Sequence, residues 1–313
     1  MPESFFLVSK EYPELAVDEV VTLIKMYDRF AKIKTISNLI LAQSVTPWEK
    51  VAKRATFIKI SGQLLRKMSN VFFDENNYSV LFGAKSFMCK AINLSKKGID
   101  VQEIERSLGN MVSTFCNAKV SLDDPEVIIY MIFTDEENFF GFSTKFIPQK
   151  RPEKLTKFHH ELDWKLTRAM INLAKINDDE IVCDPFCGTG STLLEAQSMG
   201  IKAVGIDFDE RMCKISKENL KVNKFSGEVY NNDYEYMDNI KFDGIVTDLP
   251  YGTASKVSEP PKKIMKEFLS KIPRKAKFAI MCKKGFDENI KLNLTKKYEI
   301  YRHKSLTRMI LIK

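Results

Sequence analysis

The stretch Asp184-Pro185-Phe186-Cys187-Gly188-Thr189-Gly190-Ser191 decides the fold of the second half of the chain. It ends a short apolar run, residues 181–184, which is typical of a buried strand, and it leads into a predicted helix over residues 191–199. Its two glycines permit a tight turn with positive φ and let a ligand approach the backbone closely. The helix start adds free N–H groups and the positive end of the helix dipole. The stretch therefore predicts a strand, a ligand-binding turn and a helix in succession.

Strands and helices alternate on both sides of this turn. The predicted elements around it are helix 162–174, strand 202–206, helix 210–223, strand 228–230 and strand 243–247. The tail adds helix 262–270, strand 277–282, helix 287–292 and strands 298–302 and 309–312, of which the last two fit an antiparallel hairpin at a sheet edge. Regular alternation predicts an α/β fold with a Rossmann-like, doubly wound and mostly parallel sheet.

The first 147 residues have a different pattern, in which strands and helices mix in two small α+β units. The predicted strands are 4–9, 33–45, 56–61, 78–82, 86–94, 126–133 and 139–146, and the predicted helices are 14–30, 62–68 and 100–116, with a turn over 72–78. A polar, proline-flanked stretch then indicates a linker. We therefore expect one unit over residues 1–76, a second over 77–147, the linker over 148–160 and the α/β domain over 161–313.

Positive charge is concentrated near the C-terminal end. The net charge is +8, and residues 253–313 carry 17 Lys and Arg against 5 Asp and Glu, whereas residues 1–150 carry 19 against 18. A basic run usually forms a solvated face, but this one directly follows a candidate site, and lysines attract and hold phosphates. Its position favours a polyanionic substrate, with nucleic acid as the first candidate.

Composition and cysteine spacing exclude several classes of protein. Hydrophobic content of 44% and charged content of 29% are typical of a globular protein, and no apolar run approaches the ~20 residues that span a bilayer. The N-terminal sequence lacks the features of a signal peptide, so a cytoplasmic protein is expected. The six cysteines form no CxxC pair, and Cys183 and Cys187 have no histidine at metal-ligand spacing. Buried free thiols, and no metal site, are therefore expected.

Two acids after the next two strands favour an adenosine ligand. Asp207 ends the second strand, where a carboxylate can accept from both hydroxyls of a ribose, and Asp233 follows the third, where it can accept from an adenine amino group. The turn lacks the Gly-Lys-Ser/Thr of a phosphate-binding loop, and Thr192 stands in place of the third glycine of a dinucleotide fingerprint. This set suits S-adenosylmethionine, although any one of these acids could be a helix N-cap.

A further acid, Asp248, indicates a second candidate site, which would bind an amino group. Asp248-Leu249-Pro250-Tyr251 closes the strand over residues 244–247, so it is expected at the carboxyl edge of the sheet, where ligands bind. The Asp248 carboxylate and the Pro250 carbonyl can accept two hydrogen bonds from a planar amino group, and the Tyr251 ring can stack on the base that carries it. The motif predicts an enzyme that acts on an exocyclic amine or an amide; the alternative for Tyr251 is a core aromatic.

These motifs, in this order, resemble the class I S-adenosylmethionine-dependent amino-methyltransferases, whose acceptor motif is Asp/Asn-Pro-Pro-Tyr or a near variant. More closely, the whole chain resembles the archaeal tRNA guanine-10 N2-methyltransferases, which carry an N-terminal ferredoxin-like unit and a THUMP domain. The resemblance also rests on four shorter stretches, residues 11–16, 120–127, 158–160 and 303–308.

The resemblance implies a tRNA methyltransferase that transfers one or two methyl groups from S-adenosylmethionine to N2 of a guanine. The first candidate for this guanine is guanosine 10. It also implies that the THUMP-like unit holds the acceptor end of tRNA, and we expect the chain to act as a monomer. The implied catalytic residues are Asp248, Pro250 and Tyr251. The implied cofactor-binding residues are Asp184, Phe186, Cys187, Gly188, Thr189, Gly190, Asp207, Phe208, Asp233 and Asp248.

Two stretches depart from the family pattern: Leu249 replaces the commoner first proline, and residues 158–161 replace a Phe-Phe-His-Pro-like stretch, which leaves His160 without an assigned role. Three alternatives stay open. They are a methyltransferase acting on ribosomal RNA or on N6 of adenine or N4 of cytosine in DNA, a protein glutamine methyltransferase, and a non-enzymatic tRNA-binding protein. The N-terminal half, the basic tail and the complete acceptor motif, respectively, count against them.

Overall fold

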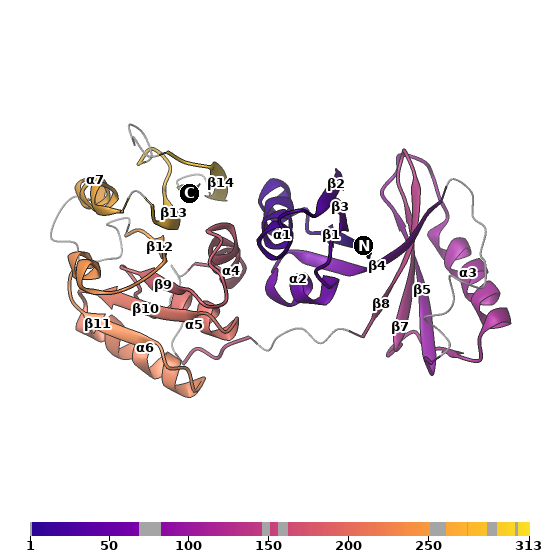
Figure 1. Ribbon diagram of the computed structural model, residues 1–313, viewed down its shortest axis with the longest axis horizontal. Helices are drawn as coiled ribbons and strands as arrows, with labels where there is room; N and C mark the ends of the chain where they lie inside the picture. The colour runs from indigo at the N-terminus through magenta and orange to yellow at the C-terminus, as the bar shows by residue number, and fades with distance from the viewer. Residues whose placement is uncertain are drawn as a thin grey trace. The chain divides into compact units, whose positions relative to one another are not determined.

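The computed structural model describes residues 2–68, 83–145, 151–155, 162–250, 261–273, 275–286, 293–303 and 306–313. The chain divides into two compact units (Figure 1). The first contains residues 1–13, 27–53 and 58–148, and the second contains residues 14–26, 54–57 and 149–313. Among the helices within the described ranges, none combines the length and the apolar character needed to cross a membrane.

The described part of the first unit is built on one eight-stranded sheet with the order β2-β3-β1-β4-β8-β7-β5-β6. Its strands are β1 (Glu3–Val8), β2 (Lys32–Ile36), β3 (Leu39–Gln43), β4 (Ile58–Met68), β5 (Ser86–Asn93), β6 (Lys119–Val120), β7 (Val127–Phe133) and β8 (Asn138–Thr144). Helix α3 (Val101–Phe115) starts at Asp100, whose carboxylate accepts from the N–H groups of Gln102 and Glu103. Because β4 pairs with β8, the two predicted α+β units share one sheet.

Several elements of the first unit differ from the sequence prediction. The single strand predicted over residues 33–45 is wrong, because β2 and β3 form an antiparallel hairpin there, and β6 was not predicted. The predicted helix over residues 62–68 is wrong, because β4 continues through it and pairs with β1 on one side and β8 on the other. Gly62 allows this pairing, since a Cβ there would collide with the backbone of Phe142 on β8. Helix α2 (Trp48–Arg54) was not predicted. The turn predicted over 72–78, the strand over 78–82 and the helix over 287–292 lie outside the described residues.

The described part of the second unit contains a seven-stranded sheet with the order β11-β10-β9-β12-β13-β15-β14. Its strands are β9 (Ile181–Asp184), β10 (Lys202–Asp207), β11 (Glu228–Asn231), β12 (Gly244–Asp248), β13 (Lys277–Lys283), β14 (Lys296–His303) and β15 (Leu306–Ile312). The first five strands of this set run parallel, and β15 runs antiparallel to both β13 and β14. The predicted doubly wound, mostly parallel sheet and its edge hairpin are confirmed.

Helices cover both faces of this sheet. They are α4 (Trp164–Leu173), α5 (Ser191–Ser198), α6 (Glu210–Val222), the 3₁₀ helix η2 (Tyr234–Asn239), which was not predicted, and α7 (Pro261–Lys271). Val204 and Ile206 of β10 belong to the core cluster that contains η2 and α7 residues, whereas Gly205 between them lies against Leu193 of α5. Alternate residues of a strand face opposite sides, so η2 and α7 cover one face and α5 covers the other (Figure 1).

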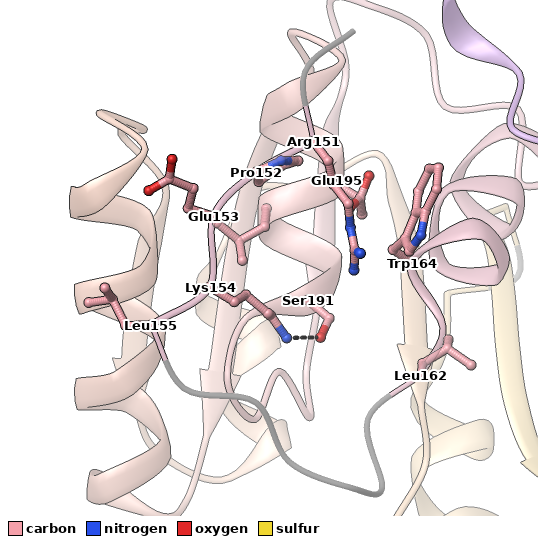
Figure 2. Close-up of a pocket in the computed structure, with 10 residues that line it drawn as sticks. Arg151, Pro152, Glu153, Lys154, Leu155, Leu162, Trp164, Ser191 and Glu195 are labelled. Atoms are coloured by element: carbon pink, nitrogen blue, oxygen red, sulfur yellow. Dashed lines mark hydrogen bonds between the residues drawn. The ribbon is translucent and has the colours of Figure 1, made fainter. Parts of the chain in front are cut away.

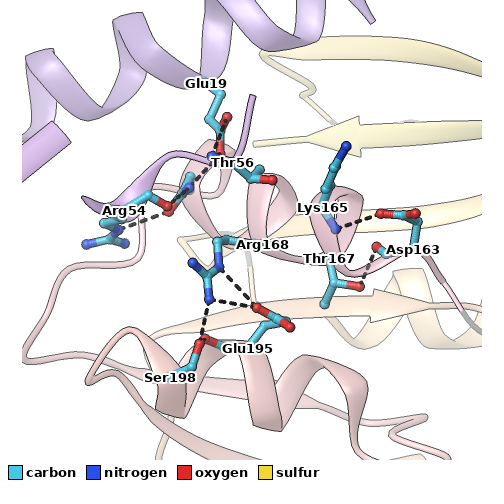
Figure 3. A network of polar contacts seen from close by, with 10 residues as sticks. Glu19, Arg54, Thr56, Asp163, Lys165, Thr167, Arg168, Glu195 and Ser198 are labelled. Atoms are coloured by element: carbon cyan, nitrogen blue, oxygen red, sulfur yellow. Dashed lines mark hydrogen bonds and ion pairs between the residues drawn. The ribbon is translucent and has the colours of Figure 1, made fainter. Parts of the chain in front are cut away.

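A segment from the start of the chain belongs to the second unit. Helix α1 (Pro13–Tyr27) places the fully buried Glu19 against α4, where the Glu19 carboxylate accepts from Asn172 Nδ2 at 2.7 Å (Figure 3). The N–H groups of Thr56 and Phe57 donate to the same carboxylate at 3.1 Å. Arg54 Nε completes the network by donating to Asn172 Oδ1 at 2.9 Å. A chain cut at residue 149 would therefore leave buried polar groups of α4 without these partners.

The environment of Glu19 gives the chain a pH-dependent stability. Burial raises the pKa of Glu19 from 4.5 to about 7, although the hydrogen bonds from Asn172, Phe57 and Thr56 act in the opposite direction. The folded state thus keeps a proton that the unfolded state releases near pH 4.5. This stabilisation is complete below pH 4.5 and is lost as the pH rises through about 7.

Between those limits we expect the free energy of unfolding to fall by on the order of 1 kcal/mol per pH unit from this group. Urea unfolding of the full chain between about pH 5 and about pH 8 measures the slope, and Glu19→Gln should lack this part of it. Glu14→Gln, at an exposed position of the same helix, is the control. Equal slopes for the wild type and Glu19→Gln would refute the assignment.

Candidate active site

The glycine turn between β9 and α5 forms the floor of the candidate site. The Cys187 N–H donates to the carbonyl of Ile206 at 2.9 Å, which fastens the turn to β10, and the Gly190 N–H donates to the carbonyl of Cys187 at 2.8 Å. Gly188 and Gly190 have φ values of +49° and +83°, in the left-handed region that glycine adopts without strain. The turn therefore exposes backbone rather than side chains at the start of α5.

Gly190 also allows α5 and α6 to approach closely. A Cβ at this position would collide with the side chain of Ser216 on α6. We expect Gly190→Ala to lower the free energy of unfolding by about 3 kcal/mol, through positive φ and overpacking together. Gly188→Ala is the matched control, because among the described residues nothing lies within 4 Å of its added Cβ. In urea unfolding, Gly188→Ala should lose only about 1 kcal/mol of the free energy of unfolding, which is the conformational cost of positive φ. Equal losses in both variants would contradict the packing argument.

Asp184 is buried at the end of β9, with 3% of its surface exposed. Its Oδ1 accepts from Thr247 Oγ1 at 2.7 Å and from the Phe186 N–H at 3.1 Å, and the Thr192 hydroxyl also bonds to the carboxylate. Burial raises the pKa of Asp184 to about 6, while these hydrogen bonds lower it. The carboxylate thus joins the glycine turn, the start of α5 and the end of β12.

Asp207 lies at the end of β10 and accepts from the turn directly. Its Oδ2 accepts from the Gly188 N–H at 2.8 Å, and its Oδ1 accepts from the Asp209 N–H at 2.9 Å. Burial raises the pKa of this carboxyl as well, against both hydrogen bonds. An ionised carboxylate has about four acceptor sites, so each oxygen can accept a further bond from a ligand. Phe208, the next residue, is 51% exposed, as a ring that stacks on a ligand would be.

The remaining residues predicted for the cofactor differ in where their side chains point. Asp233 is an exposed N-cap of η2 and accepts from the Glu235 N–H at 3.3 Å. The Phe186 ring packs in the core, with its centroid 5.2 Å from that of Phe268. The buried Cys187 side chain lies against Gly205, so only the backbone of residues 186 and 187 contributes to the turn. All six cysteines are free thiols, and five of them are buried.

The acceptor motif starts at the end of β12, next to the glycine turn. Asp248 is 22% exposed, and its Oδ2 lies 3.4 Å from Nη1 of the buried Arg308 on β15. Leu249, which had no predicted task, packs in the core with α7, and its N–H donates to the Met281 carbonyl at 2.9 Å. A proline at position 249 would lack this donor. Tyr251 lies outside the described residues, as does His160.

A hollow of about 310 Å³ lies beside the start of α5, lined by residues 151–155, Leu162, Trp164, Ser191, Leu194 and Glu195 (Figure 2). Lys154 Nζ donates to Ser191 Oγ at 2.6 Å. Two asparagines hold this segment. Asn219 Oδ1 on α6 accepts from the Leu155 N–H at 3.0 Å, and Oδ1 of Asn223, the C-cap of α6, accepts from the Glu153 N–H at 2.8 Å. The hollow thus brings charged side chains next to the glycine turn.

A buried ion pair supports the far wall of this hollow. Arg168 of α4 donates from Nε and Nη2 to Glu195 Oε2 of α5, at 3.0 and 2.9 Å, and both side chains are 6% exposed (Figure 3). Arg168 Nη2 also donates to Ser198 Oγ at 2.7 Å. The pair ties α4 to α5, and residues of both helices line the hollow. Neither this pair nor Lys154, Asn219, Thr247 and Arg308 was assigned a task from the sequence.

Comparison with known proteins places the chain among methyltransferases. The model of a family described as DNA methylase matches residues 9–218, and the RMKL-like methyltransferase domain matches residues 154–305. The tRNA (guanine(10)-N2)-dimethyltransferase of Methanocaldococcus jannaschii is 26% identical over 97% of each chain. The enzyme of the same name from Methanothermobacter thermautotrophicus is 27% identical over 98% of each chain. The solved structure of TrmN from Thermus thermophilus shares the fold, with a TM-score of 0.60 and 18% identity over 99% of each chain.

The fold is that of a class I methyltransferase, with the glycine turn, the strand-end acids and the start of the acceptor motif along one edge of a doubly wound sheet. The chain belongs to the family that the DNA methylase model describes. Two archaeal relatives named as tRNA (guanine(10)-N2)-dimethyltransferases match it over nearly its whole length.

Proposed function

We propose that the chain methylates N2 of a guanine in tRNA, at guanosine 10, with S-adenosylmethionine as the methyl donor. The observation that carries the proposal is the hydrogen bond between Thr247 and Asp184, which ties the end of the acceptor strand to the glycine turn. Two relatives that match nearly the whole chain are named as guanine-10 N2-dimethyltransferases, which supports the same substrate and the addition of two methyl groups.

The residues predicted to bind the methyl donor have the chemical groups that S-adenosylmethionine requires. The Asp207 carboxylate suits the ribose hydroxyls, the exposed Phe208 ring and the Asp233 carboxylate suit the adenine, and the turn from Gly188 to Gly190 offers backbone. Lys154, on the wall of the hollow, offers a positive charge for the carboxylate of the amino-acid end. When bound, S-adenosylmethionine supplies an electrophilic methyl group carried by a sulfonium.

The acceptor motif would act on the amine that receives this group. N2 of guanine is a poor nucleophile, because its lone pair is delocalised into the ring. Hydrogen bonds to the Asp248 carboxylate and the Pro250 carbonyl favour the pyramidal form, which returns electron density to the nitrogen. Asp248 can also take the proton that the nitrogen then loses, and Tyr251 would stack on the base. The base must leave its stack to reach this edge of the sheet.

The substrate is tRNA, and we propose that the THUMP-like unit over residues 77–147 holds its acceptor end. In the proposed domain division, a ferredoxin-like unit spans residues 1–76, a linker spans 148–160 and the methyltransferase domain spans 161–313. The basic stretch over residues 253–313 supports contact with the RNA backbone near the site. We also propose that the chain acts as a monomer in the cytoplasm.

Incorporation of labelled methyl groups tests the proposed function against its alternatives. The full chain with labelled S-adenosylmethionine is offered unmodified tRNA, ribosomal RNA, DNA and a glutamine-containing protein extract in parallel. We expect label in tRNA, in N2-methylated guanosine after digestion to nucleosides. Label in N6-methyladenine or N4-methylcytosine of DNA, in ribosomal RNA or in protein glutamine would favour the corresponding alternative. Binding of tRNA without transfer of label would identify the non-enzymatic one.

A further inference from the structure

Arg308 is a buried arginine outside the acceptor motif. It is 4% exposed on β15, and its Nη1 lies 3.4 Å from Asp248 Oδ2 and 3.7 Å from Met281 Sδ. A guanidinium removed from water is costly unless a carboxylate or other acceptors face it. Arg308 and Asp248 are 60 residues apart in the sequence, so only the sheet brings them together.

The register of the strands builds this contact into the fold. Strand β13 lies between β12 and β15, and it pairs Met281 with Asp248 on one side and Lys283 with Arg308 on the other. Paired residues, and residues two apart on a strand, share a face of the sheet, so Asp248, Met281 and Arg308 lie on the same face. The neighbouring residues Cys282 and Met309 face the opposite side, in the core with α7. Arg308 therefore reaches across one strand, past Met281, to Asp248.

We propose that Arg308 is a positioning residue that aims the Asp248 carboxylate at the target amine. A carboxylate is planar, so a guanidinium that holds Oδ2 also fixes the direction in which Oδ1 points. Charge-assisted hydrogen bonds are stronger than neutral ones, so a guanidinium holds a carboxylate in one orientation better than a neutral donor would. The inference rests on the proposed function in one respect, namely that Asp248 receives the amine of a substrate.

This role predicts a loss in turnover rather than in binding of the methyl donor. Misplacing a catalytic group by about 1 Å can cost roughly 10²-fold in rate, and Arg308→Met removes the group that holds Asp248 while keeping an unbranched apolar side chain. The glycine turn follows β9 and Asp207 ends β10, whereas Arg308 lies on β15, and β12 and β13 lie between these strands in the sheet. S-adenosylmethionine should therefore bind to Arg308→Met about as well as to the wild type.

The test compares Arg308→Met, Arg308→Lys and the control Lys202→Met in the full chain. Lys202 is an exposed cation on β10 of the same sheet and lies outside the basic stretch over residues 253–313. Its loss therefore removes a positive charge without removing the group that holds Asp248 or a cation proposed to contact the RNA. Steady-state methyl transfer gives kcat and KM, calorimetric titration with S-adenosylmethionine gives its Kd, and thermal melting reports folding.

We expect kcat to fall roughly 10²-fold in Arg308→Met, with the Kd within about twofold of the wild type. Arg308→Lys should recover about tenfold, because an ammonium also pairs with a carboxylate but lacks the planar fork. Lys202→Met should match the wild type. An unchanged kcat in Arg308→Met would overturn the inference, and so would a loss that Arg308→Lys does not relieve and that the Kd and melting temperature share.

The variants are compared with the wild type on whichever labelled acceptor, among tRNA, ribosomal RNA, DNA and protein, the wild type methylates. If the wild type methylates an acceptor other than tRNA, the proposed substrate is wrong, while the ratio of kcat values still decides the role of Arg308.

Discussion

Replacing Asp248 with alanine is expected to reduce methyl transfer to tRNA by on the order of 10³-fold while S-adenosylmethionine still binds. Asp248 lies at the carboxyl end of β12, partly exposed and in contact with Arg308, whereas the groups suited to the cofactor lie on β10 and in the glycine turn. The change therefore removes an acceptor for the amine and leaves the donor site in place. Methyl transfer under single-turnover conditions and calorimetric titration measure the two effects separately.

Asp248→Asn separates the two tasks proposed for this carboxylate. An asparagine keeps an oxygen that accepts a hydrogen bond from the amine, but it cannot take a proton. We expect its rate to fall between those of the alanine variant and the wild type. Normal turnover by Asp248→Ala would refute the mechanism. Thermal melting must accompany both variants, because each removes the anion that faces the buried Arg308.

Asp207→Ala is expected to weaken S-adenosylmethionine binding by roughly 10²-fold, the loss of two hydrogen bonds from ribose hydroxyls to a charged group. Part of the effect comes from the turn itself, since the Gly188 N–H loses its acceptor. Asp207→Asn keeps one acceptor oxygen for that N–H and so isolates the ribose contribution. Calorimetric titration measures the Kd of each variant.

Asp209→Ala provides the control for Asp207. Asp209 lies two residues further along and caps α6 by accepting from the Arg211 N–H at 2.8 Å. Its loss should cost about 1 kcal/mol of stability and change the Kd of S-adenosylmethionine by no more than about twofold. An unchanged Kd in Asp207→Ala would remove the basis of the ribose assignment. An equal loss of S-adenosylmethionine binding in Asp209→Ala would show that the loss in Asp207→Ala comes from a disturbed β10–α6 turn and not from the ribose contacts.

The order of elements in the second unit was predictable because its signals are local. Apolar runs, the two glycines of the turn and helix caps such as Asp209 are each visible within a few residues of sequence. The segment over 62–68 was predicted wrongly because Leu64 and its neighbours favour a helix by intrinsic propensity. Pairing of β4 with both β1 and β8 outweighs that preference, and such pairing depends on residues far away in the sequence.

The candidate site was predictable only in part, for a similar reason. The positions of Asp184, Asp207 and Asp248 follow from the rule that parallel strands end at one edge of the sheet. The contacts of Thr247 with Asp184 and of Arg308 with Asp248 depend on the register between strands, which no spacing in the sequence reveals. The assignment of the individual cofactor-binding and catalytic residues stays a prediction, for which these variants are the test.

The position and nature of the methylated nucleotide test the central claim most directly. Unmodified tRNA is incubated with the full chain and S-adenosylmethionine, cut into defined fragments and analysed by mass spectrometry, with a transcript carrying adenosine at position 10 as the control. We predict N2-methylguanosine or N2,N2-dimethylguanosine at position 10, and no methylation of the control transcript. Methylation at another position, on another atom of guanine or equally in the control would contradict the account.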